Sequence, residues 1–153
     1  MKSCYIVAAA ELAPERLRPE PGDLLIAADA GLLHLERLGL APDLALGDFD
    51  SLGYVPEAPQ VEVCPVRKDD TDTMTGLRLG LGRGCREFVI VGALGGRLDH
   101  TVANLQALCW LCTQGARGSH PLGGQPRLGG QGRRARAAPH GGMVSVGLRR
   151  RGM

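Results

Sequence analysis

Residues 24–46 read LLIAADAGLLHLERLGLAPDLAL, and this stretch holds two apolar runs with a helical pattern between them. The runs Leu24–Ala28 and Leu44–Leu46 are apolar throughout, which is typical of strands buried on both faces of a parallel sheet. Residues 30–38 place three leucines on one helical stripe and are followed by Gly39, a residue type that commonly ends helices. The stretch therefore predicts a strand–helix–strand unit.

The same alternation continues through the first 114 residues. Further short apolar runs predict strands at Cys4–Ala9, Val61–Val66 and Phe88–Val91. Further helices are predicted at 73–81 and at 101–113, where Val102, Leu105, Leu108 and Cys109 form the expected apolar stripe. Strand–helix alternation of this kind predicts an α/β fold with three layers and a mainly parallel, Rossmann-like sheet.

Charge divides the chain into two parts. Residues 1–114 hold all 16 acidic residues and ten basic ones, whereas residues 115–153 hold eight arginines and no acid. Eleven of these last 39 residues are glycine, with hardly any apolar periodicity. Such a segment cannot bury enough apolar surface to offset its chain entropy. We therefore predict one domain over residues 1–114 and an irregular or disordered tail over residues 115–153.

Three interpretations of the tail stay open: out-of-frame translation of a GC-rich gene, a plain disordered tail, or an Arg/Gly-rich arm that binds RNA. Its acid-free Gly/Arg/Pro/Ala composition favours the first, and its lack of Tyr, Phe and Trp argues against the third. No apolar run approaches the roughly 20 residues of a membrane helix, and the first residues lack a convincing signal peptide. We expect a cytoplasmic protein with no membrane partner.

Aspartates gather directly after the predicted strands. Seven of the nine aspartates lie there, namely Asp29, Asp48, Asp50, Asp69, Asp70, Asp72 and Asp99. The carboxyl ends of parallel strands share one edge of an open sheet, where ligands usually bind, so we expect four loops to bring these carboxylates to one cleft. Taken singly, Asp29 or Asp72 is also explained as a helix cap.

So many carboxylates in one cleft need compensation, either by protonation or by bound cations. Mg²⁺ suits oxygen ligands and usually brings substrate phosphates with it. Lys68, Arg97 and His100 lie in the same loops, where cationic groups would meet phosphate oxygens. No P-loop motif occurs and no G-x-G-x-x-G follows a strand, which excludes a P-loop kinase and an ordinary nucleotide-dependent dehydrogenase.

Four motifs taken together resemble bacterial thiamine pyrophosphokinase. They are ADAG at 28–31, GDFDS at 47–51, KDDTDT at 68–73 and GGRLDH at 95–100, which continues as TVANL at 101–105, in the order found in that family. The resemblance spans roughly residues 4–114. It implies transfer of a pyrophosphoryl group from ATP to the hydroxyl of thiamine, giving thiamine diphosphate and AMP, with Mg²⁺ as cofactor.

The resemblance also implies roles for individual residues. It assigns Mg²⁺ to Asp48, Asp50 and Asp72. It places Lys68, Thr71, Arg97, Asp99 and His100 around the nucleotide. It places Asp29, Asp50, Asp72 and Asp99 in the catalytic cleft. Which carboxylate accepts the hydroxyl proton stays open.

The tail departs from the family pattern. Thiamine pyrophosphokinases have a C-terminal β-sandwich domain that contributes to the homodimer and to the thiamine site. In residues 115–153 the only β-like triplet is Val144–Val146, which we judge too short to matter. We therefore expect the sandwich domain to be missing or replaced, thiamine turnover to be impaired, and apolar surface to be exposed on the α/β domain.

Two other functions are kept as alternatives. Residues 48–51 also resemble the nucleophile motif of haloacid-dehalogenase-like phosphohydrolases, in which Asp48 would be phosphorylated. Two strand candidates precede this motif, and Ser51 stands where that family has Thr or Val. The other alternative is a non-catalytic fragment that binds nucleotide, or RNA through its basic tail. We expect no nucleic-acid partner.

Overall fold

The computed structural model describes residues 2–12, 14–47, 60–62, 71–95, 97–121 and 143–146, and for 60–62 and 143–146 it describes the backbone alone. The strands are β1 (Ser3–Val7), β2 (Leu24–Ala28), β3 (Leu44–Leu46), β4 (Gln60–Glu62), β5 (Glu87–Val91), β6 (Arg117–Pro121) and β7 (Met143–Val146). The helices are the 3₁₀ turn η1 (Pro14–Arg16) and the α-helices α1 (Gly31–Leu38), α2 (Asp72–Gly82) and α3 (Leu98–Thr113).

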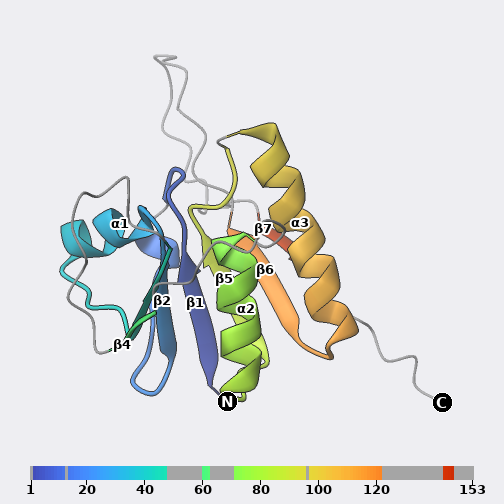
Figure 1. Cartoon of the computed structure of the whole chain (residues 1–153), viewed down its shortest axis with the longest axis horizontal. Helices are drawn as coiled ribbons and strands as arrows, with labels where there is room; N and C mark the ends of the chain where they lie inside the picture. The colour runs from blue at the N-terminus through green and yellow to red at the C-terminus, as the bar shows by residue number, and fades with distance from the viewer. Residues whose placement is uncertain are drawn as a thin grey trace, which may run out of the picture.

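The strands form one sheet in the order β4-β3-β2-β1-β5-β6-β7 (Figure 1). Every neighbouring pair is parallel except β6 and β7, which are antiparallel. The predicted α/β class and mainly parallel sheet are therefore confirmed. The predicted strands Leu24–Ala28 and Leu44–Leu46 coincide with β2 and β3.

Helices cover both faces of the sheet, which gives the three predicted layers. Along β2, Leu24, Ile26 and Ala28 face the core beneath α2 and α3, while Leu25 and Ala27 face the core beneath α1. Figure 1 shows α2 and α3 together on one face and α1 on the other. All five residues of β2 are buried, which explains why this strand is apolar without alternation.

The prediction that the chain is irregular from Gly115 onward is wrong for β6 and β7. β6 reads RGSHP and carries no apolar pattern, yet it pairs in parallel with β5. Two of its residues pack beneath α3: Gly118, which leaves no room there for a side chain, and His120, which is fully buried. Val144 belongs to the β-like triplet that we expected to be too short to matter. It pairs with His120 across the antiparallel ladder between β6 and β7. Residues 122–142 and 147–153 lie outside the described residues.

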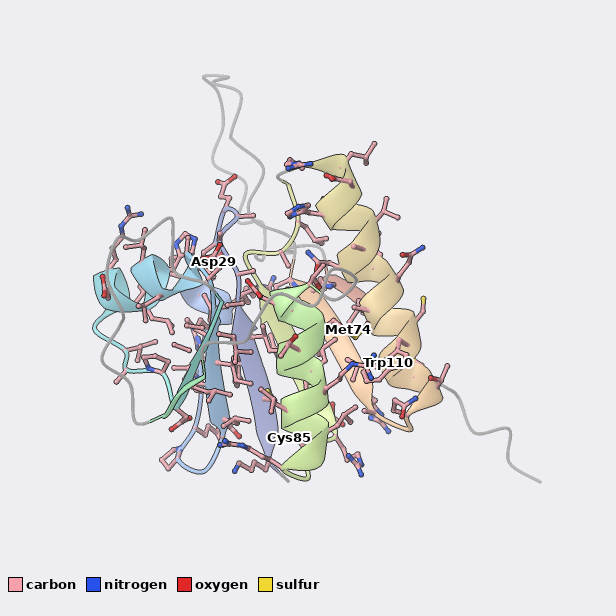
Figure 2. All side chains as sticks on the ribbon, viewed as in Figure 1. Asp29, Met74, Cys85 and Trp110 are labelled. Atoms are coloured by element: carbon pink, nitrogen blue, oxygen red, sulfur yellow. The ribbon has the colours of Figure 1, made fainter. Side chains whose placement is uncertain are left out.

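The apolar stripe predicted for residues 101–113 does not coincide with the face of α3 that is buried. Of the predicted stripe, Leu108 is buried, but Val102 is 44% exposed and Cys109 is exposed. Asn104 and Leu111, which lie outside the stripe, are buried. The cause is that α3 carries apolar residues around most of its circumference, so their spacing does not select one face. On the side next to α2, the Arg78 guanidinium lies 4.8 Å from the centre of the Trp110 ring (Figure 2).

The strand order creates a switch point at the centre of the sheet. From β1 the chain proceeds outward to β2, β3 and β4, and from β5 it proceeds outward in the opposite direction. The loops after β1 and β5 therefore diverge and leave a crevice at the carboxyl edge, where ligands bind in such folds. In Figure 2, Asp29 lies at this edge and Cys85 at the opposite end of the sheet. None of the helices described is both long and apolar enough to cross a membrane.

Candidate functional site

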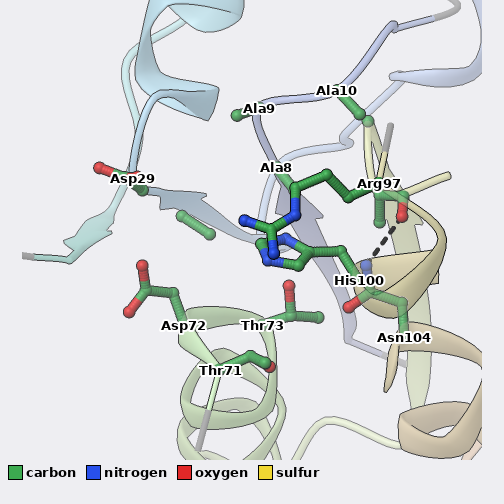
Figure 3. Close-up of a pocket in the computed structure, with 13 residues that line it drawn as sticks. Ala8, Ala9, Ala10, Asp29, Thr71, Asp72, Thr73, Arg97, His100 and Asn104 are labelled. Carbon is green, nitrogen blue, oxygen red and sulfur yellow. Dashed lines mark hydrogen bonds between the residues drawn. The ribbon is translucent and has the colours of Figure 1, made fainter. Parts of the chain in front are cut away.

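A pocket of about 330 Å³ lies at the switch point (Figure 3). It is lined by Ala8, Ala9, Ala10, Ala28, Asp29, Thr71, Asp72, Thr73, Gly92, Ala93, Arg97, His100 and Asn104. These residues come from the ends of β1, β2 and β5 and from the beginnings of α2 and α3. The volume is within the range of small-molecule sites, roughly 300–1,000 Å³.

Asp29 has a backbone conformation that few residues other than glycine adopt. It follows β2 directly, its φ angle is 49°, and its amide donates to the Leu46 carbonyl over 2.7 Å. Asp and Asn adopt the left-handed region more readily than most residues do, but still at a cost. This turn directs the Asp29 carboxylate to the sheet edge rather than into the core (Figure 3).

Asp72 approaches the same place from the first turn of α2. The helix cap is Thr71, whose hydroxyl accepts from the Met74 amide over 3.2 Å, and not Asp72. A side chain at Gly47 would place its Cβ 3.3 Å from the Asp29 Cβ and 3.3 Å from Asp72 Oδ2. The side chains of Asp29 and Asp72 therefore both lie close to Gly47, the residue that precedes the predicted ligand Asp48.

Arg97 supplies a positive group, and His100 an imidazole, on the α3 side of the pocket. Arg97 holds Asp99 with two hydrogen bonds, Nη2 to Oδ2 over 2.8 Å and Nε to Oδ1 over 3.2 Å. Desolvation raises the pKa of Asp99, but the hydrogen bonds from the Arg97 side chain and the His100 backbone, together with the charges of these two residues, outweigh it and leave this pKa below its usual value. Asp99 is thus a charged partner that orients Arg97, since it does not itself line the pocket.

Two helices begin at the pocket. Thr71, Asp72 and Thr73 line it at the start of α2, and Arg97 and His100 line it around the first turn of α3. The first amides of a helix have no partner within the helix, and the helix dipole is positive at this end. The pocket therefore offers two anion-favouring helix ends in addition to Arg97 and His100.

The opposite wall of the pocket was not predicted from the sequence. It consists of the loop after β1, at Ala8–Ala10, and the loop after β5, at Gly92–Ala93. The Ala10 amide donates to the Gly92 carbonyl over 2.7 Å, and the Ala10 carbonyl lies 2.9 Å from His34 Nε2 on α1. The only sequence signal for this wall was its place after two apolar runs, because its polar atoms belong to the backbone.

The structure brings most of the described candidate residues together. Asp29, Thr71, Asp72, Arg97 and His100 all line one pocket, and Asp99 contacts it through Arg97. Asp48, Asp50, Lys68, Asp69 and Asp70 lie outside the described residues. Within the described ranges, no three His, Cys, Asp or Glu side chains form a metal-binding group. Two of the three predicted Mg²⁺ ligands are outside those ranges, so the metal assignment stays a prediction.

Fold and site together define a doubly wound α/β domain with a pocket at its switch point, where two helix N-termini and Arg97 lie opposite carboxylates. The family model for the catalytic domain of thiamin pyrophosphokinase matches residues 20–117. The chain belongs to this family, and the predicted resemblance is confirmed. The match favours this family over the haloacid-dehalogenase-like alternative.

Individual relatives agree with the family match. Thiamine pyrophosphokinase of Bacillus subtilis (strain 168) is 33% identical over 120 residues, which cover 71% of this chain and 55% of the relative. The crystal structure of the Bacillus subtilis enzyme superposes with a TM-score of 0.67 at 29% identity, over 78% of this chain and 60% of that one. For the Geobacillus thermodenitrificans enzyme the TM-score is 0.64 at 26% identity, over 79% and 64%. The chain thus spans little more than half the length of the curated relative it matches.

Proposed function

We propose that this chain provides the nucleotide-binding part of an enzyme that transfers pyrophosphate from ATP to thiamine. The observation that carries the proposal is the pocket at the switch point, where two helix N-termini, Arg97 and His100 face two carboxylates across one cavity. A polyphosphate chain with a bound divalent cation is a ligand that would use both sides of the cavity. Its oxygens would contact Arg97 and the helix N-termini, and its cation would contact the carboxylates.

The carboxylates suit a divalent cation bound together with the phosphates. The side chains of Asp29 and Asp72 both lie close to Gly47, and their carboxylates are hard oxygen donors of the kind that Mg²⁺ prefers. We propose that Asp72, with Asp48 and Asp50 of the same motif set, would hold Mg²⁺. When bound, this ion would supply charge neutralisation and orientation of the phosphates.

The proposed reaction forms one bond and breaks one. The thiamine hydroxyl oxygen bonds to the β-phosphorus of ATP, the bond from that phosphorus to the oxygen bridging the α-phosphate breaks, and AMP leaves. The hydroxyl proton passes to a carboxylate of the cleft, for which Asp29 is a candidate. Arg97, oriented by Asp99, would contact the phosphates, and the first amides of α2 and α3 would stabilise their charge.

Two measurements on the full chain test the proposal. Calorimetry with Mg-ATP measures nucleotide binding, and release of AMP from Mg-ATP in the presence of thiamine measures turnover. Asp72→Asn should weaken both about tenfold or more, because it removes a charge that faces the phosphate-bound cation.

Asp43→Asn is the matched control. Asp43 lies at the opposite edge of the sheet, where its Oδ2 accepts from the Leu25 amide over 2.8 Å, and an asparagine there still offers an oxygen. Wild-type chain that binds no Mg-ATP would refute the proposal, as would equal losses in the two variants.

A further inference from the structure

Asn104 is a buried polar residue that lines the pocket and has no role in the function proposed above. It lies on the second turn of α3 and is 7% exposed. Its Nδ2 donates to the Ala93 carbonyl over 2.8 Å, across the base of the loop between β5 and α3 (Figure 3). A buried amide of this kind is costly unless its hydrogen-bonding groups are used.

The orientation of the Asn104 amide follows from its partner. A carbonyl oxygen only accepts hydrogen bonds, so the nitrogen of Asn104 must face Ala93 and the oxygen must point the other way. Among the described residues no hydrogen bond reaches Oδ1, and none of their polar side-chain atoms is both buried and without a partner. Oδ1 is therefore accessible from the pocket, in the space that Thr73 and His100 also line (Figure 3).

Asn104 is itself held from behind by β6. His120 is fully buried, with Nε2 3.2 Å from the Asn104 carbonyl and Nδ1 3.2 Å from the Ile90 carbonyl. These contacts connect the α3 turn that carries Asn104 to Ile90 of β5, three residues before the Ala93 carbonyl that Asn104 binds. The side chain therefore extends from a fixed piece of backbone.

The loop that Asn104 contacts is fixed on its other side too. Gly92 has a φ angle of 68°, its carbonyl accepts from the Ala10 amide over 2.7 Å, and a side chain there would overlap the Ala8 carbonyl. The loop after β5 is thus attached to the loop after β1 at Gly92 and to α3 at Ala93. Loss of the second attachment would free the segment that leads to Arg97.

We propose that Asn104 is a positioning and specificity residue: Nδ2 fixes the β5–α3 loop through Ala93, and Oδ1 accepts a hydrogen bond from the ligand. Because Oδ1 only accepts, the ligand must present a hydrogen-bond donor there, and we propose that this donor is the exocyclic amino group of a nucleotide base or of the thiamine pyrimidine. This acceptor role rests on the proposed function, whereas the loop-fixing role does not.

Amide hydrogen exchange on the ligand-free full chain tests the loop-fixing role. Asn104→Leu and Asn104→Asp both remove the donor to Ala93, so the Ala10 amide, which donates to the Gly92 carbonyl of this loop, should exchange on the order of tenfold faster relative to the amides of β2. Leu111→Ala, a fully buried position on the same helix, destabilises the core without touching the loop and should leave that ratio unchanged. Unchanged loop exchange in the Asn104 variants, or the same change in Leu111→Ala, would overturn this role. Asn104→Asp keeps the shape of the side chain and decides the matter if Asn104→Leu does not fold.

Calorimetry with paired ligands tests the acceptor role. The pairs are ATP against purine riboside triphosphate, which lacks the amino group, and thiamine against its analogue with a carbonyl in place of the amino group. In one of the two pairs, the wild-type chain should bind the member that carries the amino group about tenfold more tightly than the member that lacks it. Asn104→Leu should abolish that preference, while Asn104→Asp, which keeps an acceptor oxygen, should retain it because its charge affects both members alike.

The outcomes separate this inference from the proposed function. The pair whose preference is lost identifies the ligand that Oδ1 contacts. A preference that survives in Asn104→Leu overturns the acceptor role while leaving the proposed function intact. Wild-type chain that binds none of the four ligands refutes the proposed function and the acceptor role together, and the exchange ratio still decides the loop-fixing role.

Discussion

Replacing Gly118 by alanine tests whether the segment after Gly115 is part of the folded domain. Gly118 lies in β6 directly beneath α3. An added Cβ would overlap Leu108 Cδ2 and would lie 2.9 Å from Leu111 Cδ1. Both leucines are fully buried, so neither can turn away without displacing its neighbours.

The size of the effect follows from two opposing contributions. Overpacking a well-filled core costs about 1–3 kcal/mol. Replacing glycine restricts the unfolded chain and returns about 0.4–1 kcal/mol. The free energy of unfolding should therefore fall by about 1–2 kcal/mol, which for a chain of this length lowers Tm by about 2–8 °C.

Gly82→Ala provides the matched control. Gly82 is the last residue of α2, and an added Cβ would find no heavy atom within 4 Å. The same substitution should therefore raise the free energy of unfolding by about 0.4–1 kcal/mol. Urea unfolding followed by circular dichroism measures both variants, with unchanged m-values as the sign that the unfolded states are comparable. Stabilisation by Gly118→Ala equal to that by Gly82→Ala would refute the packing of β6 beneath α3.

Three further substitutions test the cap of α2, the buried histidine and the contact of α1 with β1. Thr71→Ala removes the hydroxyl that accepts from the Met74 amide and should lower the free energy of unfolding by about 1 kcal/mol in urea titrations, whereas Thr71→Ser should retain most of it. Burial lowers the pKa of His120 from its usual 6.5, so the unfolded chain binds the proton more readily than the folded chain. The free energy of unfolding should therefore fall as the pH drops below about 6.5. His120→Gln should flatten this pH dependence in unfolding curves measured across that range. Gly31→Ala would place a Cβ against the Val7 carbonyl, which is backbone and cannot turn away, so Tm should fall as for a loss of about 3 kcal/mol.

The parts of the fold that the sequence predicts well are the central strands. β2 and β3 are buried on both faces, so every residue is apolar and the run begins and ends where the strand does. α1 is predicted equally well because Gly39 ends it in the left-handed conformation with a φ angle of 69°. In each case one local physical cause determines the element.

β6 and the buried face of α3 are not predictable in this way. β6 has a glycine and a histidine at its buried positions, because the space beneath α3 admits no side chain at Gly118 and because two backbone carbonyls surround His120. Neither cause produces an apolar pattern in the sequence, so hydrophobic patterning does not predict β6. α3 is apolar on several sides, so only its packing on β6 and against α2 selects Leu108 and Leu111 as core residues.

The candidate site also has a part that the sequence predicts and a part that it does not. The aspartates after successive strands, with Arg97 and His100, predict a shared cleft because parallel strands end at one edge. The alanine wall and Asn104 do not show in the sequence as site residues, since the wall acts through its small size and its backbone groups. The sequence places Asn104 in the continuation of the last motif without a role, and the role follows only from the Ala93 carbonyl 2.8 Å from its amide nitrogen.

By itself the sequence determined the α/β class, the central strands, the family and the loops that carry the charged groups. These features rest on local causes: continuous apolar runs, a helix-ending glycine, and motifs whose residues are close along the chain. Only the tertiary structure decided that part of the segment after Gly115 extends the sheet, which side of α3 is buried, and that Asn104 faces the pocket. Those depend on contacts between residues 11 to 31 positions apart, such as Ala93 with Asn104 and Phe88 with Ser119, which no local pattern records.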